Sequence, residues 1–314
     1  MSSPKITRTN RAYSSRVLRI VLFVEDGGGD WHAKRLCEAL KALGAEVTVT
    51  SLKFCAFDTR LKTGIHIPSF ENELPDGVFV RSISTGTLEQ ITLRLGILHA
   101  LRECGVRVWN DARVIERCVD KSTATFLFQK AGLPVPCTKT AEGPEAAAQF
   151  FVDQNHPLVI KPLFGSQGNG IQRITAKEEL PPPEQVGHVY YLQKYLRRPQ
   201  NKSFEDWRVF VSQGRVLAAM ARVGQTWITN VHQGAEPVSV EADDEMTEMA
   251  LKATHAIGAD YAGVDLIRDQ DGRLLVLEIN SNPAWKGLQS VTDINIAWTL
   301  AQDFLSAVSE YAQN

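Results

Sequence analysis

Short apolar runs alternate with amphipathic segments over the first 110 residues of the chain. Val17–Val24 predicts a buried strand, and Trp31–Leu43 has its apolar residues at helical spacing. The alternation continues with strands predicted at 46–50, 78–81 and 106–109 and a helix at 87–104. Strands that alternate with helices indicate a parallel sheet. We therefore predict an N-terminal parallel α/β domain over residues 17–112.

The second half of the chain has longer strands and fewer helices. Strands are predicted at 158–162, 189–195, 208–211, 216–222, 261–268 and 273–280, and helices at 120–131, 245–257 and 303–312. This pattern indicates an α+β arrangement with antiparallel strands. We predict a small central domain at 113–195, which contains a glycine loop, and a C-terminal domain at 196–314. The expected fold class is thus α/β followed by α+β.

Charge and composition exclude several classes of protein. The chain has 34 basic and 36 acidic side chains, and this balance argues against a nucleic-acid-binding protein. No apolar run approaches the roughly 20 residues that span a bilayer. The five cysteines are an odd number without a C-x-x-C pair, so we expect reduced thiols in a cytoplasmic protein with no nucleic-acid or membrane partner.

Residues 1–16 form a basic arm, with four basic side chains and no acidic one. No apolar segment precedes a cleavage site, so a secretory signal is not expected. We predict a disordered arm. An import peptide, or a phosphate- or RNA-binding role, is the alternative.

Two carboxylates and an amide come together on one predicted hairpin. Asp271-Gly272 favours a two-residue type I′ turn, which places Asp265 directly opposite Glu278. Glu278 and Asn280 share a face because they lie two residues apart on a strand. Opposed carboxylates repel each other, and a cation with oxygen ligands relieves that repulsion. The sequence predicts a Mg²⁺ (or Mn²⁺) site at these three residues, unless one acid faces solvent or the register differs by one.

A glycine loop at 165–170 follows a predicted strand that ends near Lys161. Backbone N–H groups of such a loop approach polyphosphates closely, and a strand lysine adds a point charge. The spacing fits neither a Walker A motif nor a dinucleotide fingerprint, and an ordinary tight turn is the alternative. Asp206, Arg208 and Arg222 lie in apolar strands, where arginines suit the binding of phosphate or carboxylate groups. Solvent-exposed surface positions are the alternative for these arginines.

These residues resemble the ATP-grasp superfamily, specifically the RimK-type carboxylate–amine ligases. The resemblance runs from about Val78 to Asn295 and includes Val119–Lys121, Gly132–Pro136, Ile160–Gly168, Leu192–Tyr195, Asp206–Arg208, Ala219–Arg222, Thr229–Asn230, Gly263–Asp265 and Glu278–Asn280. It implies an ATP-grasp fold with an N-terminal pre-ATP-grasp domain, a small central domain and a C-terminal ATP-binding domain with an antiparallel sheet.

The family pattern implies a role for each matching residue of the ATP site. ATP would be bound by Lys121, Lys161, Gly165, Ser166, Gln167, Gly168, the adenine hinge Gln193, Lys194, Tyr195 and Leu196, and by Asp206 and Asn230. Arg208 and Arg222 would be the catalytic residues, which hold the acyl phosphate and the transferred phosphoryl group. Asp265, Glu278 and Asn280 fall on the family's magnesium ligands.

Two stretches look most like the tetrahydromethanopterin α-L-glutamate ligases. They are Arg81–Thr92 with Arg94–His99, and Asn280–Gln289. The resemblance implies acceptor binding at Arg81, Ser84 and Thr85. It also implies that ATP, L-glutamate and a small pterin carboxylate are the reaction partners, and we expect a homo-oligomer.

Other acceptors and one other class of protein remain open. Ile228 stands where ribosomal-type members carry an arginine, which argues against the modification of ribosomal proteins. A deazaflavin coenzyme, methylofuran or a protein C-terminus are alternative acceptors. A non-catalytic ATP-binding regulatory module is the alternative from a different class.

Overall fold

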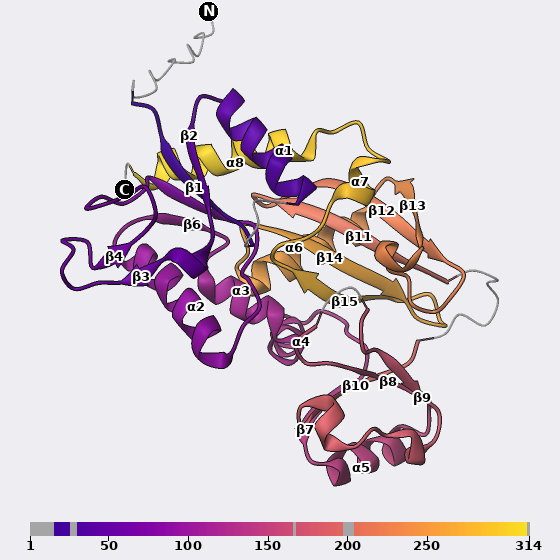
Figure 1. The fold of residues 1–314 in the computed structure, drawn as a ribbon. Helices are drawn as coiled ribbons and strands as arrows, with labels where there is room; N and C mark the ends of the chain where they lie inside the picture. The colour runs from indigo at the N-terminus through magenta and orange to yellow at the C-terminus, as the bar shows by residue number, and fades with distance from the viewer. Residues whose placement is uncertain (1–15, 26–29, 166–167, 197–203, 313–314) are drawn as a thin grey trace, which may run out of the picture.

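The computed structural model describes residues 16–25, 30–165, 168–196 and 204–312 and arranges them around three sheets (Figure 1). A two-stranded ribbon, β3 (Ala56–Phe57) with β4 (Ile65–His66), extends from the first sheet. The predicted arm, apart from Arg16, lies outside the described residues, as do the predicted ATP ligands Ser166 and Gln167. The mixed fold with one parallel and two antiparallel sheets confirms the predicted fold class.

The first sheet is parallel throughout, in the order β2-β1-β5-β6. Its elements are β1 (Arg19–Phe23), α1 (Trp31–Ala42), β2 (Glu46–Thr50), β5 (Gly77–Val80), α2 (Leu88–Glu103), β6 (Arg107–Trp109) and α3 (Ala112–Val119). Alternate residues of β1 pack on opposite faces: Leu22 joins the core with α1, and Val21 joins the core with α2. The two helices therefore cover opposite faces of the sheet.

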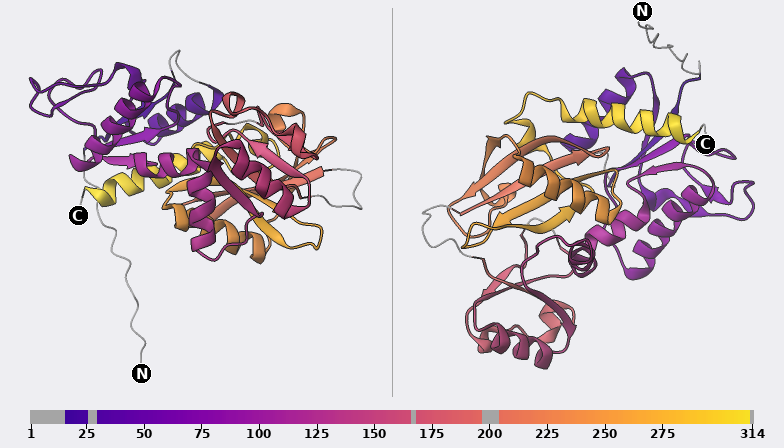
Figure 2. Two further views of the ribbon diagram at one scale, coloured as in Figure 1. Left: turned by 90° about the horizontal axis from the view of Figure 1, so that it is seen from below. Right: turned by 180° about the vertical axis from the view of Figure 1, so that it is seen from behind.

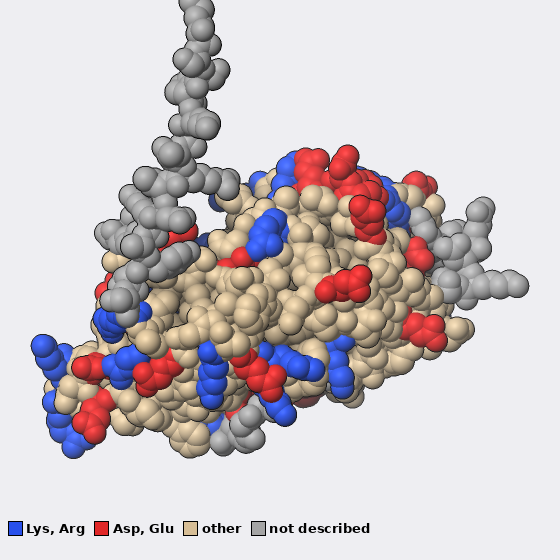
Figure 3. Space-filling view, turned by 90° about the horizontal axis from the view of Figure 1, so that it is seen from above, with Lys and Arg blue, Asp and Glu red and all other residues tan. Residues whose placement is uncertain are grey.

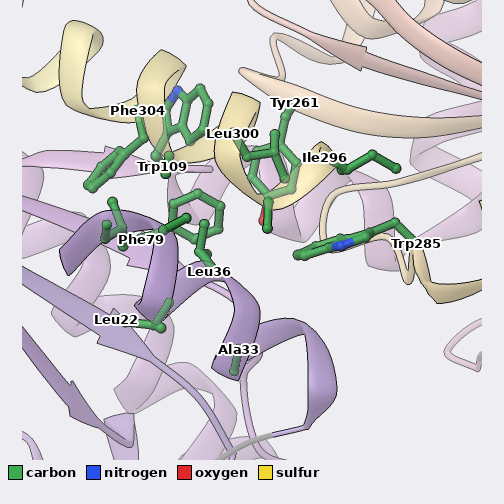
Figure 4. Close-up of a cluster of buried hydrophobic side chains, with 14 of the residues drawn as sticks. Leu22, Ala33, Leu36, Phe79, Trp109, Tyr261, Trp285, Ile296, Leu300 and Phe304 are labelled. Carbon is green, nitrogen blue, oxygen red and sulfur yellow. The ribbon is translucent and has the colours of Figure 1, made fainter. Parts of the chain in front are cut away.

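The last helix, α8 (Ile296–Tyr311), returns to the first sheet and packs beside α1. Figure 4 shows Phe304 of α8 in a cluster with Phe79 and Trp109 of the first sheet and Tyr261 of the third. The helix begins at Ile296 rather than at the predicted residue 303. It lies over the first sheet, although the predicted boundaries assign its residues to the C-terminal domain. The first and third sheets thus share one hydrophobic core.

The second sheet is antiparallel, in the order β7-β10-β8-β9, and is the smaller lobe in Figure 1 and in the right view of Figure 2. Its elements are β7 (Thr138–Glu142), α5 (Pro144–Gln154), β8 (Leu158–Lys161), β9 (Gln172–Ile174) and β10 (Val189–Lys194), and α4 (Lys121–Lys130) precedes them. Phe150 of α5 packs on Ile160 and Leu192, so α5 covers one face of the sheet.

The third sheet is also antiparallel, in the order β13-β12-β11-β14-β15. Its elements are β11 (Phe204–Ser212), β12 (Arg215–Gly224), β13 (Glu236–Val240), α6 (Asp244–Ile257), β14 (Tyr261–Arg268), β15 (Leu274–Asn280) and α7 (Lys286–Gln289). Ala250 and Ala253 of α6 pack on Val209 and Val264, so this helix covers the far face of the sheet. The opposite face carries Phe210 and Met220 of the core shared with the first sheet, and the charged residues described below.

The hairpin of β14 and β15 has the predicted pairing but not the predicted turn. Asp269 N–H donates to the carbonyl of Arg273 at 3.0 Å, so the loop between them has three residues rather than two. Towards the strand ends, Asp265 pairs with Glu278, and a register shift follows before the next pair. Leu277 is the extra residue of this β-bulge. The bulge offsets the longer loop by one residue, and Asp265 lies opposite Glu278 as predicted.

The described part of the chain holds no helix that is both long enough and apolar enough to cross a membrane. Figure 3 shows one face of the molecule, on which basic and acidic side chains lie among one another around an area without charged side chains. This mixture of charges agrees with the formal net charge of −2.

Candidate active site

A cavity lies between the second and third sheets, and most of the predicted ATP, catalytic and metal residues line it. These residues are Lys121, Lys161, Gly165, Gly168, Gln193, Lys194, Tyr195, Leu196, Asp206, Arg222, Asn230, Asp265 and Glu278. Arg208 and Asn280 do not line the cavity. They lie next to its wall, where Arg208 contacts Asp265 and the amide of Asn280 donates to Glu278 Oε1 at 3.1 Å. Thus the structure brings the predicted ATP and metal residues that it describes into one region.

Charged side chains follow one another across the strands of the third sheet. Asp206 of β11 pairs with Arg222 of β12, and Arg208 of β11 pairs with Asp265 of β14. Each arginine binds its partner with two nitrogens: Arg222 at 2.6 and 2.6 Å, and Arg208 at 2.7 and 2.7 Å. Arg222 also reaches Asp265 at 3.0 Å. Such two-point contacts fix both the position and the orientation of the carboxylates.

Burial and ion pairing compete in setting the charge state of these carboxylates. Burial alone would raise the pKa of Asp265, but Arg208 and Arg222 outweigh it and hold that pKa below its usual value. Burial raises the pKa of Asp206 in spite of the Arg222 charge and a hydrogen bond of 2.7 Å from the hydroxyl of Thr229. The buried charges are therefore stable only as a group, because the removal of one leaves its partners uncompensated.

Two lysines approach the cavity from different elements. Lys121 is the first residue of α4, which begins there because the Asp120 carboxylate caps the N–H groups of Ser122 and Thr123. Its Nζ donates to the carbonyl of Gly165 at 2.9 Å and so contacts the glycine loop. Burial lowers the pKa of Lys121.

The second lysine, Lys161, ends β8 and is buried. Its Nζ donates to Gln193 Oε1 at 2.8 Å. Burial lowers the pKa of Lys161 to about 8, a shift that the Lys121 charge increases and nearby carboxylates oppose. Among the described residues, a neutral amide is the only hydrogen-bond partner of this buried ammonium, which is therefore well placed to bind an anion.

Positive charge exceeds negative charge in and beside the cavity. The cations are Lys121, Lys161, Lys194, Arg208 and Arg222, and the carboxylates are Asp206, Asp265 and Glu278. An excess of cations, held on rigid strands and beside a glycine loop, suits a polyphosphate.

The predicted metal ligands offer only oxygen donors, which fit a hard cation such as Mg²⁺. Asp265 already binds two arginines, so a metal here would share its oxygens with Arg208 and Arg222. In the described ranges, no group of three or more His, Cys, Asp or Glu side chains is arranged to hold a metal. The amide oxygen of Asn280 is therefore needed to complete a set of three ligands.

Sequence reasoning missed the apolar residues of the cavity wall. Val159, Ile171, Trp227, Ile228, Ile267 and Leu277 also line it. Leu277 reaches the cavity from the β-bulge, and no sequence pattern predicted this bulge. Trp227, in contrast, stands three residues before Asn230, and its position beside a predicted ligand was a signal that could have identified it.

The predicted adenine hinge consists of the last two residues of β10 and the two residues that follow it. The N–H of Lys194 donates to the carbonyl of Cys137 at 2.8 Å, and that of Tyr195 donates to the carbonyl of Pro157 at 2.9 Å. The side chain of Gln193 accepts from Lys161. The backbone N–H of Leu196 is therefore the next group along the hinge that can contact a ligand.

The predicted acceptor residues Arg81, Ser84 and Thr85 lie outside the cavity, after the carboxyl end of β5. Arg81 donates to the carbonyl of Asn282 at 3.1 Å and to the carboxylate of Asp30 at 3.2 Å. Its Nε and the hydroxyl of Ser84 are buried without a hydrogen-bond partner. Buried polar atoms without partners are rare and often mark a place where a ligand or water is bound.

These residues lie where neighbouring strands of the first sheet lead into helices on opposite faces. β1 leads into α1 on one face, and the neighbouring strand β5 leads into α2 on the other. In open α/β sheets, ligands bind in the crevice at the carboxyl ends of two such strands. Asp30 caps α1 on one side of this crevice, and Arg81 lies on the other side.

Comparisons with known proteins agree with this geometry. Residues 118–304 match the RimK-like ATP-grasp domain. The chain is 34% identical over 239 residues to the tetrahydromethanopterin:alpha-L-glutamate ligase of Methanococcus maripaludis, an alignment that covers 74% of this chain and 80% of that protein. It is 27% identical over 277 residues to the alpha-aminoadipate–LysW ligase LysX of Saccharolobus solfataricus, with 85% of this chain and 94% of that protein covered.

The solved structures show the same fold. The ATP-grasp ligase PsnB, in a complex with minimal precursor, Mg and ADP, superposes with a TM-score of 0.70. The superposition covers 93% of this chain and 98% of that one, at 22% sequence identity.

Proposed function

The chain belongs to the RimK-like ATP-grasp family and is an ATP-dependent carboxylate–amine ligase, and from this premise we propose that it joins L-glutamate to a tetrahydromethanopterin-type pterin. The observation that carries the proposal is the cavity between the two antiparallel sheets, where cations exceed carboxylates and oxygen ligands share one wall. The identity to a relative named for this substrate supports the choice of acceptor. Glutamate appears in the names of further relatives as well.

We assign the phosphates of ATP to Lys121, Lys161 and the glycine loop, since Lys121 donates to the carbonyl of Gly165 and the buried Lys161 lies four residues before that loop in the chain. The base lies at the hinge, and Asp206 and Asn230 lie along the nucleotide. Asp265, Glu278 and Asn280 would hold Mg²⁺ (or Mn²⁺), which would supply positive charge to offset that of the phosphates.

The proposed reaction has two steps. An oxygen of the acceptor carboxylate attacks the γ-phosphorus of ATP, the bond to the β-phosphate oxygen breaks, and ADP leaves. The amine of L-glutamate then attacks the acyl carbon, the bond to the phosphate oxygen breaks, and the proton lost by the amine goes to solvent. Arg222, in the cavity wall, contacts the transferred group, and Arg208 holds Asp265 and the acyl phosphate beside it. The side chains act by positioning and charge, as in other phosphoryl transfers.

The acceptor is proposed to bind in the crevice at Arg81, Ser84 and Thr85. A guanidinium with a free Nε and a free hydroxyl suit a carboxylate or a polar ring edge of the acceptor. Arg81 also contacts the carbonyl of Asn282, two residues after the proposed metal ligand Asn280. The crevice and the ATP cavity are thereby joined through the segment that follows β15.

The test is a ligase assay with the full chain, ATP, Mg²⁺ and L-glutamate against a panel of acceptors. The panel contains a pterin, a deazaflavin coenzyme, methylofuran and a peptide with a free C-terminus. We expect phosphate release only when glutamate and the pterin are both present, with a product heavier by one glutamate residue. Phosphate release that is indifferent to glutamate would overturn the ligase assignment, and a preference for another acceptor would overturn the pterin. Light scattering of the same preparation tests the proposed homo-oligomer.

A further inference from the structure

Two aromatic side chains from different sheets meet at the cavity. Tyr195 follows β10 of the second sheet, and Trp227 follows β12 of the third. Their rings pack edge to face, with centroids 5.7 Å apart and an interplanar angle of 85°. The guanidinium of Arg173 lies over the ring of Tyr195, with its Cζ 5.4 Å from the ring centroid. Both aromatic residues line the cavity.

The aromatic pair lies at the end away from Lys161. Tyr191 pairs with Lys161, and the N–H of Tyr195 donates to the carbonyl of Pro157 at 2.9 Å. Pro157 is four residues before Lys161, which corresponds to about 13 Å along a strand. A nucleotide with its phosphates at Lys161 therefore has its base near Tyr195 and Trp227.

We infer that Trp227, supported by Tyr195, packs on the nucleobase of ATP and is a base-binding residue of the enzyme. This inference rests on the proposed nucleotide site. Two hinge N–H groups are already bonded to carbonyls, so they contribute little to recognition of the base. Apolar residues, among them Ile267 and Leu277, line the same cavity, and an aromatic ring among them offers the stacking surface that a base prefers.

The loop that carries Trp227 also touches the glycine loop. A Cβ added at Gly168 would lie 3.0 Å from the Cγ2 of Ile228, the residue next to Trp227. The position of Trp227 is thus set from two sides, by Tyr195 and by this loop contact. A base-binding side chain held in this way loses little conformational freedom when the ligand binds.

The experiment measures binding of MgADP and of magnesium tripolyphosphate, which has no base, to the full chain. The variants are Trp227→Ala and Trp227→Phe, and the matched control is Trp298→Phe. Trp298 is 36% exposed on α8 and does not line the cavity. We expect Trp227→Ala to weaken MgADP binding by about tenfold or more, whereas tripolyphosphate binds as it does to the wild type. We expect Trp227→Phe to stay within about threefold for MgADP, because it keeps an aromatic face.

Fluorescence gives a second readout that does not depend on the alanine variant. MgADP should change the emission of the wild type and of Trp298→Phe, and Trp227→Phe should lose most of that change although five tryptophans remain of the six. Wild-type MgADP affinity in Trp227→Ala overturns the inference. An equal loss of tripolyphosphate binding, or a fluorescence response to the acceptor instead of the nucleotide, overturns it too. These assays involve no turnover, so a failure of the proposed ligase reaction is seen separately.

Discussion

The guanidinium of Arg208 binds both carboxylate oxygens of Asp265, across β11 and β14. This contact gives the predicted metal ligand a second, structural role. Asp265 is 1% exposed and also accepts from Arg222, whereas Glu278 opposite it is only half-buried. The two carboxylates of the proposed metal site therefore differ in how much of the fold depends on them.

We predict that Asp265→Ala and Glu278→Ala both reduce turnover by about 100-fold or more, because each removes an oxygen ligand. Only Asp265→Ala should also lower the free energy of unfolding, by about 3 kcal/mol, because Arg208 loses its two-point partner and the buried Arg222 loses its second carboxylate. Urea denaturation and the ligase assay, run on both variants, measure the two effects. Equal stability of the two variants would contradict the structural role of Asp265.

Lys161 should make nucleotide affinity depend on pH. Burial lowers its pKa to about 8, so the unliganded protein loses this charge as the pH rises above 8. We expect the dissociation constant of MgATP to rise above pH 8, by up to about tenfold per pH unit. Lys161→Gln, which cannot titrate, should bind weakly at all pH values and lack this added slope. Calorimetric titrations between pH 7 and 9.5 test the prediction.

The same lysine has an opposite effect on stability. Its folded pKa lies below the unfolded value of 10.5, so between pH 8 and 10.5 the unfolded chain binds more protons than the folded one. This group therefore makes the free energy of unfolding rise with pH through that window. Subtraction of the Lys161→Gln stability curve from that of the wild type isolates its contribution, and a difference that falls with pH would refute the assignment.

Gly168 allows a close approach between two loops of the cavity. It has a φ of +75°, and an added Cβ would lie 2.8 Å from the side-chain nitrogen of Gln233. We predict that Gly168→Ala raises the KM for ATP about tenfold. Gly214→Ala is the matched control, since Gly214 has a φ of +67° in the β11–β12 turn and nothing within 4 Å of the added Cβ. Both variants should lose about 1 kcal/mol of stability through the left-handed backbone, and only the first should change the KM.

Substitution of Ser84 distinguishes a role in acceptor binding from a role in folding stability. Its buried hydroxyl has no partner, so Ser84→Ala removes no hydrogen bond from the free protein. We expect an unchanged or slightly higher free energy of unfolding together with a KM for the acceptor about fivefold higher, the loss of one hydrogen bond to the ligand. The KM for ATP should stay constant. An unchanged KM for the acceptor would remove Ser84 from the proposed crevice.

The sequence predicted the sheet types and the pairing of Asp265 with Glu278. The prediction of this pairing assumed a two-residue turn, which the structure does not have. The loop has three residues, and the bulge at Leu277 restored the register. Hydrophobic alternation identified β14 and β15 because both are apolar strands. It missed β7 and β13, since the first is mostly polar and the second, an edge strand, contains Pro237.

Contacts between distant segments also could not be predicted from the sequence. The two-point pairing of Arg222 with Asp206 depends on the register of β11 and β12, which shifts after Phe210. The placement of α8 on the first sheet depends on packing against α1, more than 250 residues earlier in the chain. Local periodicity carries no information on such partners. The residues of the site were therefore predictable, but which of them pair with one another was not.

The return of α8 to the first sheet has a consequence for how the protein is made. A methyl group on Gly77 of β5 would clash with Val308 of α8, so the last helix packs directly on a strand that leaves the ribosome long before it. Until α8 has been synthesised, the face of the first sheet that α1 covers lacks the rest of its cover, and the packing around Phe79 and Trp109 is incomplete. The nascent chain thus carries an incomplete N-terminal domain for most of its synthesis, a period during which such surfaces are prone to aggregation.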